Sequence, residues 1–270
     1  MSFLFERNQI WDRPNAFVKP HSLLAPYIAH YTVSFPAHTP SPGTLTLIPD
    51  ASGCMVFRIS ANKIRCDFWG ATTKTMTVFK DANWECLMFF VEFLPCGAQQ
   101  LFDIDFADYT DHRLLMEQVN WKIQKALEQS IEKAETLDDL VREFDCFFLR
   151  QIKDRNCTQW PLDLLRFIQN ERKIPGAHDI AAYASYSERH ISRLLRPALG
   201  LTLKQYLRLL RVNKAVQHIK ATQIPLTELA QQLGYYDQAH FNHDFKRVCG
   251  STPTQYRQKM SDFYNEEFKF

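Results

Sequence analysis

The chain has 270 residues, of which 46% are hydrophobic, and a formal net charge of +2 at pH 7. That apolar content excludes global disorder, and the length favours two domains over one. No run approaches the roughly eighteen apolar residues of a membrane-spanning helix, and the N-terminus lacks a signal-peptide pattern, so we expect a cytoplasmic protein.

The seven cysteines are scattered along the chain and include no C-x-x-C pair. Disulfide frameworks and zinc knuckles need an even or closely spaced set of cysteines. We therefore expect buried, reduced thiols.

The first 110 residues have the composition of a β domain. Runs rich in β-branched and aromatic residues, separated by Pro, Gly, Asn and Asp, predict strands. These runs cover 30–35, 44–48, 54–59, 64–69 and 84–94. Strands of this number and length predict a small barrel or sandwich.

Four side chains of these strands are candidates for a ligand site. Arg58 lies in an otherwise apolar strand, where it faces either a carboxylate ligand or water, and Glu92 has the same two interpretations. Trp69 and Trp84 either line an apolar ligand cavity or belong to the packed core.

Two amphipathic helices are predicted over 111–130 and 136–153. The second has more apolar surface than packing on a small barrel requires, so we expect it to form the antiparallel seam of a two-fold dimer. The seam residues are Leu137, Leu140, Val141, Phe144, Phe147 and Phe148. The polar stretch 154–161, which ends in proline, predicts an interdomain linker.

The last part of the chain is basic. Residues 158–270 hold 16 Lys and Arg against 10 Asp and Glu, a net charge of +6, whereas residues 1–157 have a net charge of −4. A basic module attached to an acidic domain indicates nucleic-acid binding.

Helical periodicity is strong throughout this basic module. The predicted helices cover 162–172, 180–184, 187–196, 203–221, 227–233, 237–247 and 252–260. Twice a short helix, a tight turn and a second helix follow one another, which is the helix-turn-helix pattern.

A short motif occurs twice in this module at a spacing of fifty residues. Gly200, Thr202, Gln205 and Tyr206 return as Gly250, Thr252, Gln255 and Tyr256. Repetition at this period indicates that one supersecondary unit is used twice. In each copy the glycine ends a helix in the left-handed conformation, and Thr with Gln forms the capping box of the next helix.

The segment from Ile224 to Arg257, IPLTELAQQLGYYDQAHFNHDFKRVCGSTPTQYR, resembles the signature of the AraC/XylS family of bacterial transcription regulators. Its Ala-x3-Gly, Phe-x3-Phe-Lys and Gly-x-Thr-Pro-x-x-Tyr-Arg elements stand in the family's order. The resemblance implies an all-α, seven-helix unit with two helix-turn-helix subdomains joined by the long helix. Each subdomain would present a recognition helix to successive major grooves, roughly 34 Å apart.

The recognition helices are expected at 187–196 and 237–247. The family motif implies that the first faces bases with Arg189, Ser192 and Arg193. With the phenylalanines of the second helix turned inward, its outward side chains are Gln238, Ala239, His240, Asn242 and His243, of which Gln and Asn suit adenine. Phosphate contacts are expected from Arg196, Lys204, Arg208, Arg211, Lys246 and Arg247. The alternative for each is a solvated surface side chain.

Two residues depart from the family pattern. Ser185 stands where glycine is usual, which predicts a slightly strained first turn. Pro197 is expected to kink or end the first recognition helix, because its ring opposes the carbonyl of Arg193. The first subdomain would then read DNA loosely, and equal losses of affinity from Arg193→Ala and Gln238→Ala would contradict this hypothesis.

The N-terminal half has a weaker resemblance. Residues 49–57 and 93–98 are similar to the Pro-Asp-Gly-Cys and Phe-x-Pro-Gly segments of one sensor subgroup of the family. The resemblance implies an α+β chain whose N-terminal cupin-like barrel senses a small molecule or dimerises. His21 and His38 lie outside the predicted strands and His30 begins the first of them, so the three do not form a facial triad, and neither a metal nor a cofactor is expected.

We therefore expect a non-enzymatic, sequence-specific transcription activator that acts as a homodimer on double-stranded DNA, with RNA polymerase and a small-molecule effector as further partners. The expected domains are 1–110 (sensor), 111–157 (helical dimerisation segment), 158–260 (DNA-binding) and 261–270 (tail). Two alternatives stay open. An architectural binder would show near-uniform affinity across sequences. A DNA-alkylation repair enzyme with the same module would need a reactive cysteine.

Overall fold

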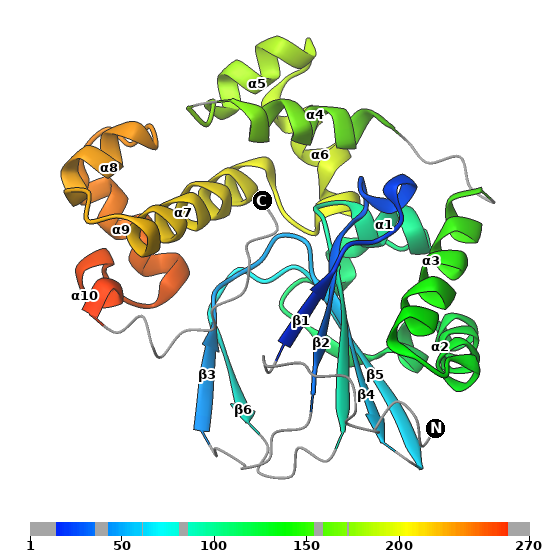
Figure 1. The fold of residues 1–270 in the computed structure, drawn as a ribbon. Coiled ribbons are helices and arrows are strands. Elements are labelled where there is room, and N and C mark those ends of the chain that lie inside the picture. Colours follow the sequence, from blue (N-terminus) through cyan, green and yellow to red (C-terminus); the bar gives the residue numbers. More distant parts are fainter. Residues whose placement is uncertain are drawn as a thin grey trace.

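The computed structural model describes residues 15–35, 43–60, 62–80, 86–153, 159–171 and 173–258. The sheet-rich N-terminal part and the helical C-terminal part are two distinct regions that lie in contact (Figure 1). The α+β organisation predicted from the sequence is therefore confirmed.

The described strands form two antiparallel sheets. The larger has the order β1-β2-β7-β4-β5-β8, and β3 pairs with β6 in the smaller one. The bounds are β1 Asn15–Val18, β2 Ile28–Ser34, β3 Gly43–Leu47, β4 Cys54–Ser60, β5 Lys63–Trp69, β6 Met76–Lys80, β7 Leu87–Phe93 and β8 Arg113–Leu115. Of the predicted small barrel or sandwich, the barrel is not confirmed in the described part of the chain, because no ladder joins the two sheets.

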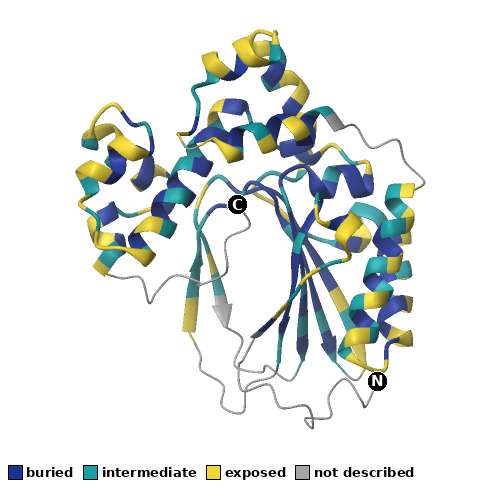
Figure 2. Ribbon diagram, turned by 45° about the horizontal axis from the view of Figure 1, so that its top comes forward, coloured by how far each residue is buried: buried dark blue, intermediate teal, exposed yellow. Residues whose placement is uncertain are grey.

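One face of the large sheet is covered by helices α2 (Met116–Lys133) and α3 (Leu137–Lys153). The ring of Phe144 on α3 lies 5.2 Å from that of Phe57 and 4.8 Å from that of Phe89, centroid to centroid. In Figure 2 the strands of this sheet are mostly buried. Helix α3 therefore closes the hydrophobic core of its own domain.

This packing corrects the predicted dimer seam. Leu140, Phe144 and Phe148 are fully buried and Phe147 is 7% exposed, while Leu137 and Val141 are partly buried. An open sheet needs a cover on its apolar face, and α3 supplies it within the protomer. The apolar surface that a second copy was expected to bury is already buried.

Helix α2 begins later than the predicted residue 111, because residues 113–115 form β8 against β5. Inside α2, Asn120 has non-helical dihedral angles and its side chain accepts hydrogen bonds from the N–H groups of Lys122 and Ile123. The helix is therefore kinked and recapped at Asn120.

The C-terminal part contains helices α4 to α10 (Figure 1). Their bounds are α4 Gln159–Asn170, α5 Ala177–Ala184, α6 Glu188–Leu199, α7 Leu203–Ala221, α8 Leu226–Gln232, α9 Gln238–Cys249 and α10 Pro253–Gln258. The helices alternate between buried and exposed residues along their length, as amphipathic helices do (Figure 2). Residues 159–161 of the predicted linker belong to α4, and the rest of that linker lies outside the described residues.

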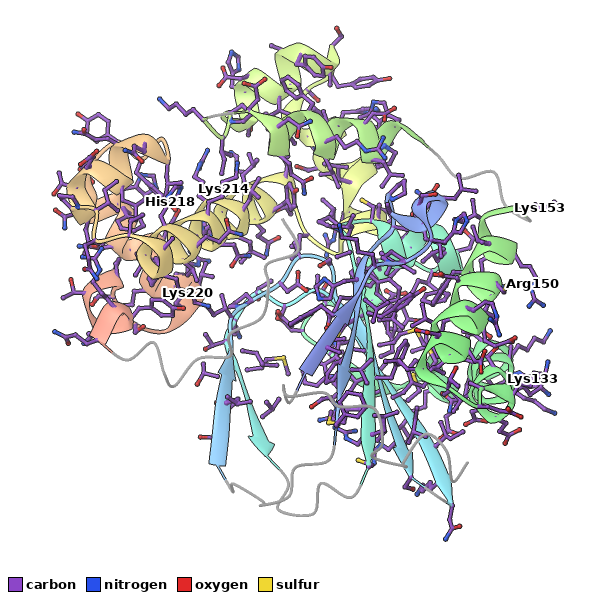
Figure 3. All side chains as sticks on the ribbon, in the orientation of Figure 1. Lys133, Arg150, Lys153, Lys214, His218 and Lys220 are labelled. Carbon is purple, nitrogen blue, oxygen red and sulfur yellow. The ribbon has the colours of Figure 1, made fainter. Side chains whose placement is uncertain are left out.

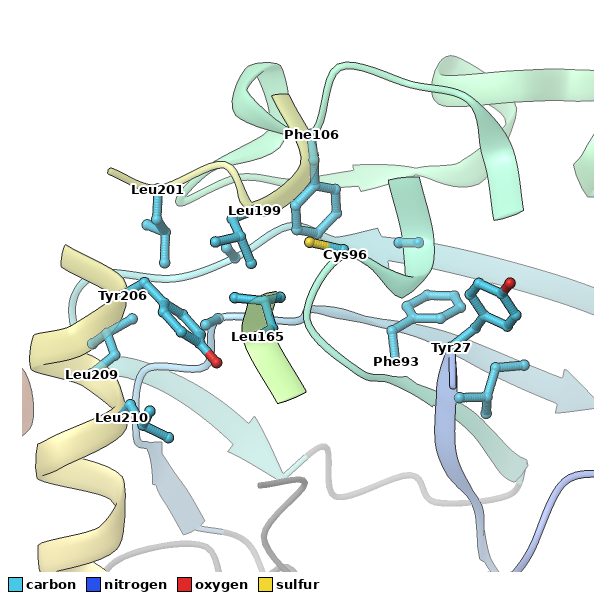
Figure 4. Close-up of a cluster of buried hydrophobic side chains, with 14 of the residues drawn as sticks. Tyr27, Phe93, Cys96, Phe106, Leu165, Leu199, Leu201, Tyr206, Leu209 and Leu210 are labelled. Carbon is cyan, nitrogen blue, oxygen red and sulfur yellow. The ribbon is translucent and has the colours of Figure 1, made fainter. Parts of the chain in front are cut away.

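The two regions share an apolar interface. Leu199, the last residue of α6, lies beside Phe106 and Cys96 of the N-terminal domain, and Leu201 follows it on the side of Tyr206 (Figure 4). Phe106 begins the 3-10 helix η3 (Phe106–Tyr109), and Cys96 directly precedes helix α1 (Gly97–Phe102). All four side chains are at most 2% exposed, so the sheet domain and the first recognition helix are packed directly together.

Two hydrogen bonds accompany this interface. The Thr110 hydroxyl donates to the carbonyl oxygen of Gly200 at 2.7 Å, and the amide of Asn213 on α7 donates to that of Pro49 at 3.3 Å. Backbone carbonyls at helix ends and in loops lack intrahelical donors. Thr110 therefore supplies a donor to a carbonyl oxygen of the helical region, and Asn213 supplies one to a carbonyl oxygen of the sheet domain.

Candidate DNA interface

The first helix-turn-helix unit consists of α5, a turn at Ser185 and α6. Ser185 has φ 56° and ψ 33°, the left-handed conformation in which glycine is favoured. Ser187 caps α6, and its Oγ accepts the N–H of His190 at 3.2 Å. Ser185 is thus a non-glycine residue with positive φ, the conformation on which the predicted strain depends.

The second unit consists of α8, a turn at Gly234 and α9. Gly234 has φ 82°, and Asp237 caps α9 by accepting the N–H of His240 at 2.7 Å. Two residues separate Gly234 from its cap, whereas only Tyr186 separates Ser185 from Ser187. The second turn is thus one residue longer, and it includes Tyr236, which is 93% exposed.

The repeated capping residues behave as predicted. Gly200 and Gly250 both have φ 71° and end α6 and α9. The side chains of Thr202 and Gln205 form a capping box at the start of α7, and Thr252 with Gln255 does the same before α10. In each copy the repeat therefore ends one helix at a glycine and begins the next helix with a capping box.

The predicted readers on α6 are on its outer side. Arg189 and Arg193 are exposed, and Ser192 is half-buried, while Ile191 and Leu195 face the core. A guanidinium nitrogen of Arg193 lies 3.2 Å from Nδ1 of His190. This contact orients Arg193 along the outer face of the helix.

Pro197 does not end α6, which corrects the prediction from the sequence. The helix runs on to Leu199, and the N–H of Gly200 bonds to the carbonyl of Arg196 at 2.8 Å. Ala198 and Leu199 are buried in the apolar interface with the N-terminal domain. Their burial holds the last turn in helical form despite the hydrogen bond that proline cannot donate.

On α9, Ala239, His240 and His243 are exposed, and Gln238 and Asn242 are half-buried. The hydroxyl of Thr227 on α8 donates to Oε1 of Gln238 at 2.8 Å. Thr227 thereby holds Gln238, one of the two side chains that were expected to read adenine. The sequence pattern did not identify this positioning role, because it depends on the packing of α8 against α9.

The predicted phosphate ligands divide into two groups. Arg196, Lys246 and Arg247 are exposed. Lys204 is also exposed, and its Nζ lies 3.3 Å from the carboxylate of Glu188.

By contrast, Arg208 and Arg211 on α7 make internal contacts. Arg208 pairs with Asp244 at 2.9 Å, a contact that ties α7 to α9. Arg211 donates to the carbonyl oxygen of Pro175 and lies over the ring of Tyr235 at 5.9 Å. Because Pro175 precedes the first unit and Tyr235 lies in the second, Arg211 links the two units.

Three further basic residues of α7 are labelled in Figure 3: Lys214, His218 and Lys220. The amine of Lys214 donates to the carbonyl oxygen of Gln169 at 3.3 Å. Partial burial lowers the pKa of both lysines. Part of the positive charge of α7 therefore lies inside the module and not on its surface.

Of the predicted ligand residues of the N-terminal domain, Arg58, Trp69 and Glu92 lie on one face of the large sheet. Arg58 is partly exposed and pairs with Asp67, Trp69 is 9% exposed, and Glu92 is buried on β7. Trp84 lies outside the described residues. Within the described ranges no group of three or more His, Cys, Asp or Glu is arranged to hold a metal ion. The helices of those ranges include none long and apolar enough to cross a membrane.

Comparison with known proteins separates the two halves of the chain. A family described as a helix-turn-helix domain matches residues 180–259, and a domain of unknown function (DUF6597) matches residues 16–115. The crystal structure of ToxT from Vibrio cholerae O395 aligns with 91% of this chain and 96% of its own, at 13% identity and a TM-score of 0.38.

Two bacterial regulators match about a third of the chain. Regulatory protein SoxS of Escherichia coli K12 is 31% identical over 99 residues, which are 36% of this chain and 92% of SoxS. The F1 operon positive regulatory protein of Yersinia pestis is 26% identical over 96 residues, 35% of this chain and 32% of that protein. With the double helix-turn-helix and its signature in place, the chain belongs to the AraC/XylS family of DNA-binding transcription regulators.

Proposed function

We propose that this regulator reads a specific DNA sequence with α6 and α9 and activates transcription. The observation that carries the proposal is the pair of capped recognition helices, each with polar side chains on its outer face. Arg193 would grip guanine, and Gln238 and Asn242 would read adenine. Arg189, Ser192, Ala239, His240 and His243 would complete the base-facing set, and Arg196, Lys204, Lys246 and Arg247 would hold phosphates.

The internal contacts of α7 support reading by both helices at once. The links from Arg208 to Asp244 and from Arg211 to Pro175 and Tyr235 join the two units through one helix. Two helices held in one arrangement suit two successive grooves, roughly 34 Å apart on one face of the duplex. Arg208 and Arg211 therefore act in this proposal as positioning residues more than as phosphate ligands.

Activation is proposed from the relative in Yersinia pestis, whose name describes a positive regulator. An activator implies RNA polymerase as a partner of the bound complex. A homodimer through α3 is not part of this proposal, since the apolar face of α3 is buried within the protomer. Control by a small effector of the N-terminal domain stays in the proposal.

Three of the seven thiols do not fit the reactive cysteine that the repair-enzyme alternative requires. Burial raises the pKa of Cys66, Cys96 and Cys249. A nucleophilic cysteine needs a lowered pKa and an accessible sulfur. These three thiols are therefore protonated and enclosed at neutral pH.

The test is selection of a binding site from a randomised duplex pool with the full chain, followed by titration of the selected and scrambled duplexes at one salt concentration. We expect the selected site to bind about 10³-fold more tightly or better. Gln238→Ala should cost roughly 1–3 kcal/mol on the selected site and relax the preference at one base position. Equal binding of the two duplexes would support an architectural role and overturn the proposal.

Two further variants distinguish the roles of the charged side chains. Lys246→Gln should weaken binding to every sequence and lower the slope of log affinity against log salt by about 1. Arg166→Gln is the matched control, because Arg166 is about half exposed on α4 and lies outside both recognition helices. A loss of base preference in Arg166→Gln would contradict the assignment of reading to α6 and α9.

A further inference from the structure

Three arginines of the large sheet converge on one carboxylate. Asp67 on β5 accepts hydrogen bonds from Arg58 on β4, from Arg65 at 3.2 Å and from Arg113 on β8 at 3.0 Å. The side chain of Asp67 is 2% exposed, whereas the arginine side chains are 28%, 49% and 34% exposed. We call these four residues the arginine cluster.

The arginine cluster lies on the sheet face opposite the helices. Phe57 and Cys66 are register partners on the face that α3 covers, and strand alternation turns Arg58, Arg65 and Asp67 to the other face. Arg58 and Arg65 are themselves direct partners across β4 and β5. Like charges in such a position destabilise a sheet unless something between them compensates.

One carboxylate does not balance three guanidinium groups. Burial alone would raise the pKa of Asp67, but its hydrogen bonds and ion pairs with the arginines outweigh burial and hold that pKa below its usual value. Asp67 is therefore ionised at neutral pH, and the arginine cluster has two positive charges in excess. Asp67 is also the one carboxylate within the described ranges that pairs with these arginines.

The indole N–H of Trp69, a buried donor beside the arginine cluster, also lacks an acceptor among the described residues. Trp69 follows Asp67 on the same face of β5, and the guanidinium of Arg113 lies 5.0 Å from its ring centroid. The indole is 9% exposed, and its Nε1 has no hydrogen-bond partner among the described residues. Buried N–H donors in native proteins are almost always paired, with protein, water or ligand.

We propose that the arginine cluster is an oxyanion-binding site that takes the carboxylate or phosphate group of a small molecule. Guanidinium groups bind both kinds of oxyanion with paired, charge-assisted hydrogen bonds. Asp67 positions the three arginines, and their N–H groups that do not bond to Asp67 donate to the oxyanion. The indole N–H of Trp69 is a further donor at the edge of the site. The site goes beyond the proposed reading of DNA and does not depend on it.

The test is isothermal titration of the full chain, without DNA, with inorganic phosphate in one arm and succinate in the other. Ionic strength is held constant with sodium chloride, so that chloride is the reference anion. We expect saturable binding at a single site in at least one arm, and the arm that binds more tightly identifies the kind of oxyanion. Absence of saturable binding in both arms would overturn the proposal.

Variants tie the binding to the arginine cluster. Arg58→Gln and Arg65→Gln should each weaken the binding of the oxyanion about tenfold. Arg142→Gln is the matched control, since Arg142 also pairs with a carboxylate, that of Asp139 on α3, and is 68% exposed. Equal affinities in the three variants would contradict the assignment.

A second measurement guards against a variant that folds poorly. Binding of an oxyanion to the native state raises the midpoint of thermal unfolding. Phosphate or succinate should raise that midpoint in the wild-type chain and in Arg142→Gln, and raise it clearly less in Arg65→Gln, whose side chain is the most exposed of the three arginines. An equal rise in Arg65→Gln would place the binding elsewhere.

Discussion

The two helix-turn-helix units share a sequence pattern but differ in their neighbours. Gly200 ends α6 against the N-terminal domain. The Cβ of an alanine at this position would lie 2.6 Å from Oγ1 of Thr110 and 3.0 Å from the carbonyl oxygen of Phe106. Gly250 ends α9 in the same conformation, and the nearest atom to its Cβ is Oγ1 of Thr75 at 3.5 Å. The glycine that ends the helix is thus tightly packed in the first unit and loosely packed in the second.

The difference teaches where each requirement for glycine originates. A positive φ is a local property that both positions share, and it disfavours any side chain. Overlap with another domain is a tertiary property: a Cβ at Gly200 would overlap Thr110, whereas one at Gly250 would make only an ordinary contact with Thr75. Matched substitutions in the two units separate these two contributions.

The largest difference is expected between Gly200→Ala and Gly250→Ala. The left-handed conformation alone should cost about 1 kcal/mol at each position, and the overlap with Thr110 and Phe106 should raise the loss at Gly200 to roughly 2–4 kcal/mol. Urea unfolding of the two full-length variants at pH 7 measures both. Equal losses of unfolding free energy would mean that Thr110 and Phe106 move aside without destabilising the chain, and they would contradict the comparison.

Gly234→Ser should have the next largest effect. It places in the second turn the residue that the first turn already has, with a φ of 82°. Its Cβ would meet mainly the flexible end of Lys173, so left-handed strain of roughly 1–2 kcal/mol should dominate the loss of stability. Thermal unfolding checks this, and a loss above that of Gly200→Ala would reverse the order we expect.

Thr110→Val tests the polar part of the interface at Gly200. Removing the hydroxyl leaves the Gly200 carbonyl without this donor and should cost about 1 kcal/mol. Thr75→Val is the counterpart near Gly250, and we expect it to be nearly neutral. Hydrogen exchange of the last turn of α6 should rise in Thr110→Val alone; a similar rise at the end of α9 would argue against a local effect.

The smallest expected effect is a gain in stability. Ser185→Gly relieves the left-handed strain of the first turn and should stabilise the chain by about 0.5–1 kcal/mol. The added flexibility of the unfolded chain offsets part of this gain. A shift of the urea midpoint upward is the readout, and a downward shift would show that the serine is not strained.

The sequence allowed accurate prediction wherever structure is set by near neighbours. Capping boxes, glycine stops and the apolar stripe of α7 involve residues a few positions apart, and α7 occupies the predicted range 203–221. The two turns were located for the same reason. The readers of α6 and α9 were placed on outward faces because Ile191, Phe241 and Phe245 define the inward ones.

What the sequence did not predict depends on distant partners. The apolar face of α3 was assigned to a second copy because no local signal says that Phe144 meets Phe57 and Phe89. Pro197 was expected to kink or end α6, yet the helix continues to Leu199, which is buried against another domain. Of the arginine cluster the sequence indicated only Arg58, because the other members come together from two further strands.

The apolar interface of Leu199 and Leu201 with the N-terminal domain also bears on how the protein can be dissected. A fragment that begins near residue 159 would bring these two buried leucines into contact with water, together with Leu165 on α4 (Figure 4). Exposed apolar patches of this kind promote self-association. The isolated DNA-binding module should therefore be poorly soluble, and polar replacements at Leu199 and Leu201 are the first remedy to try.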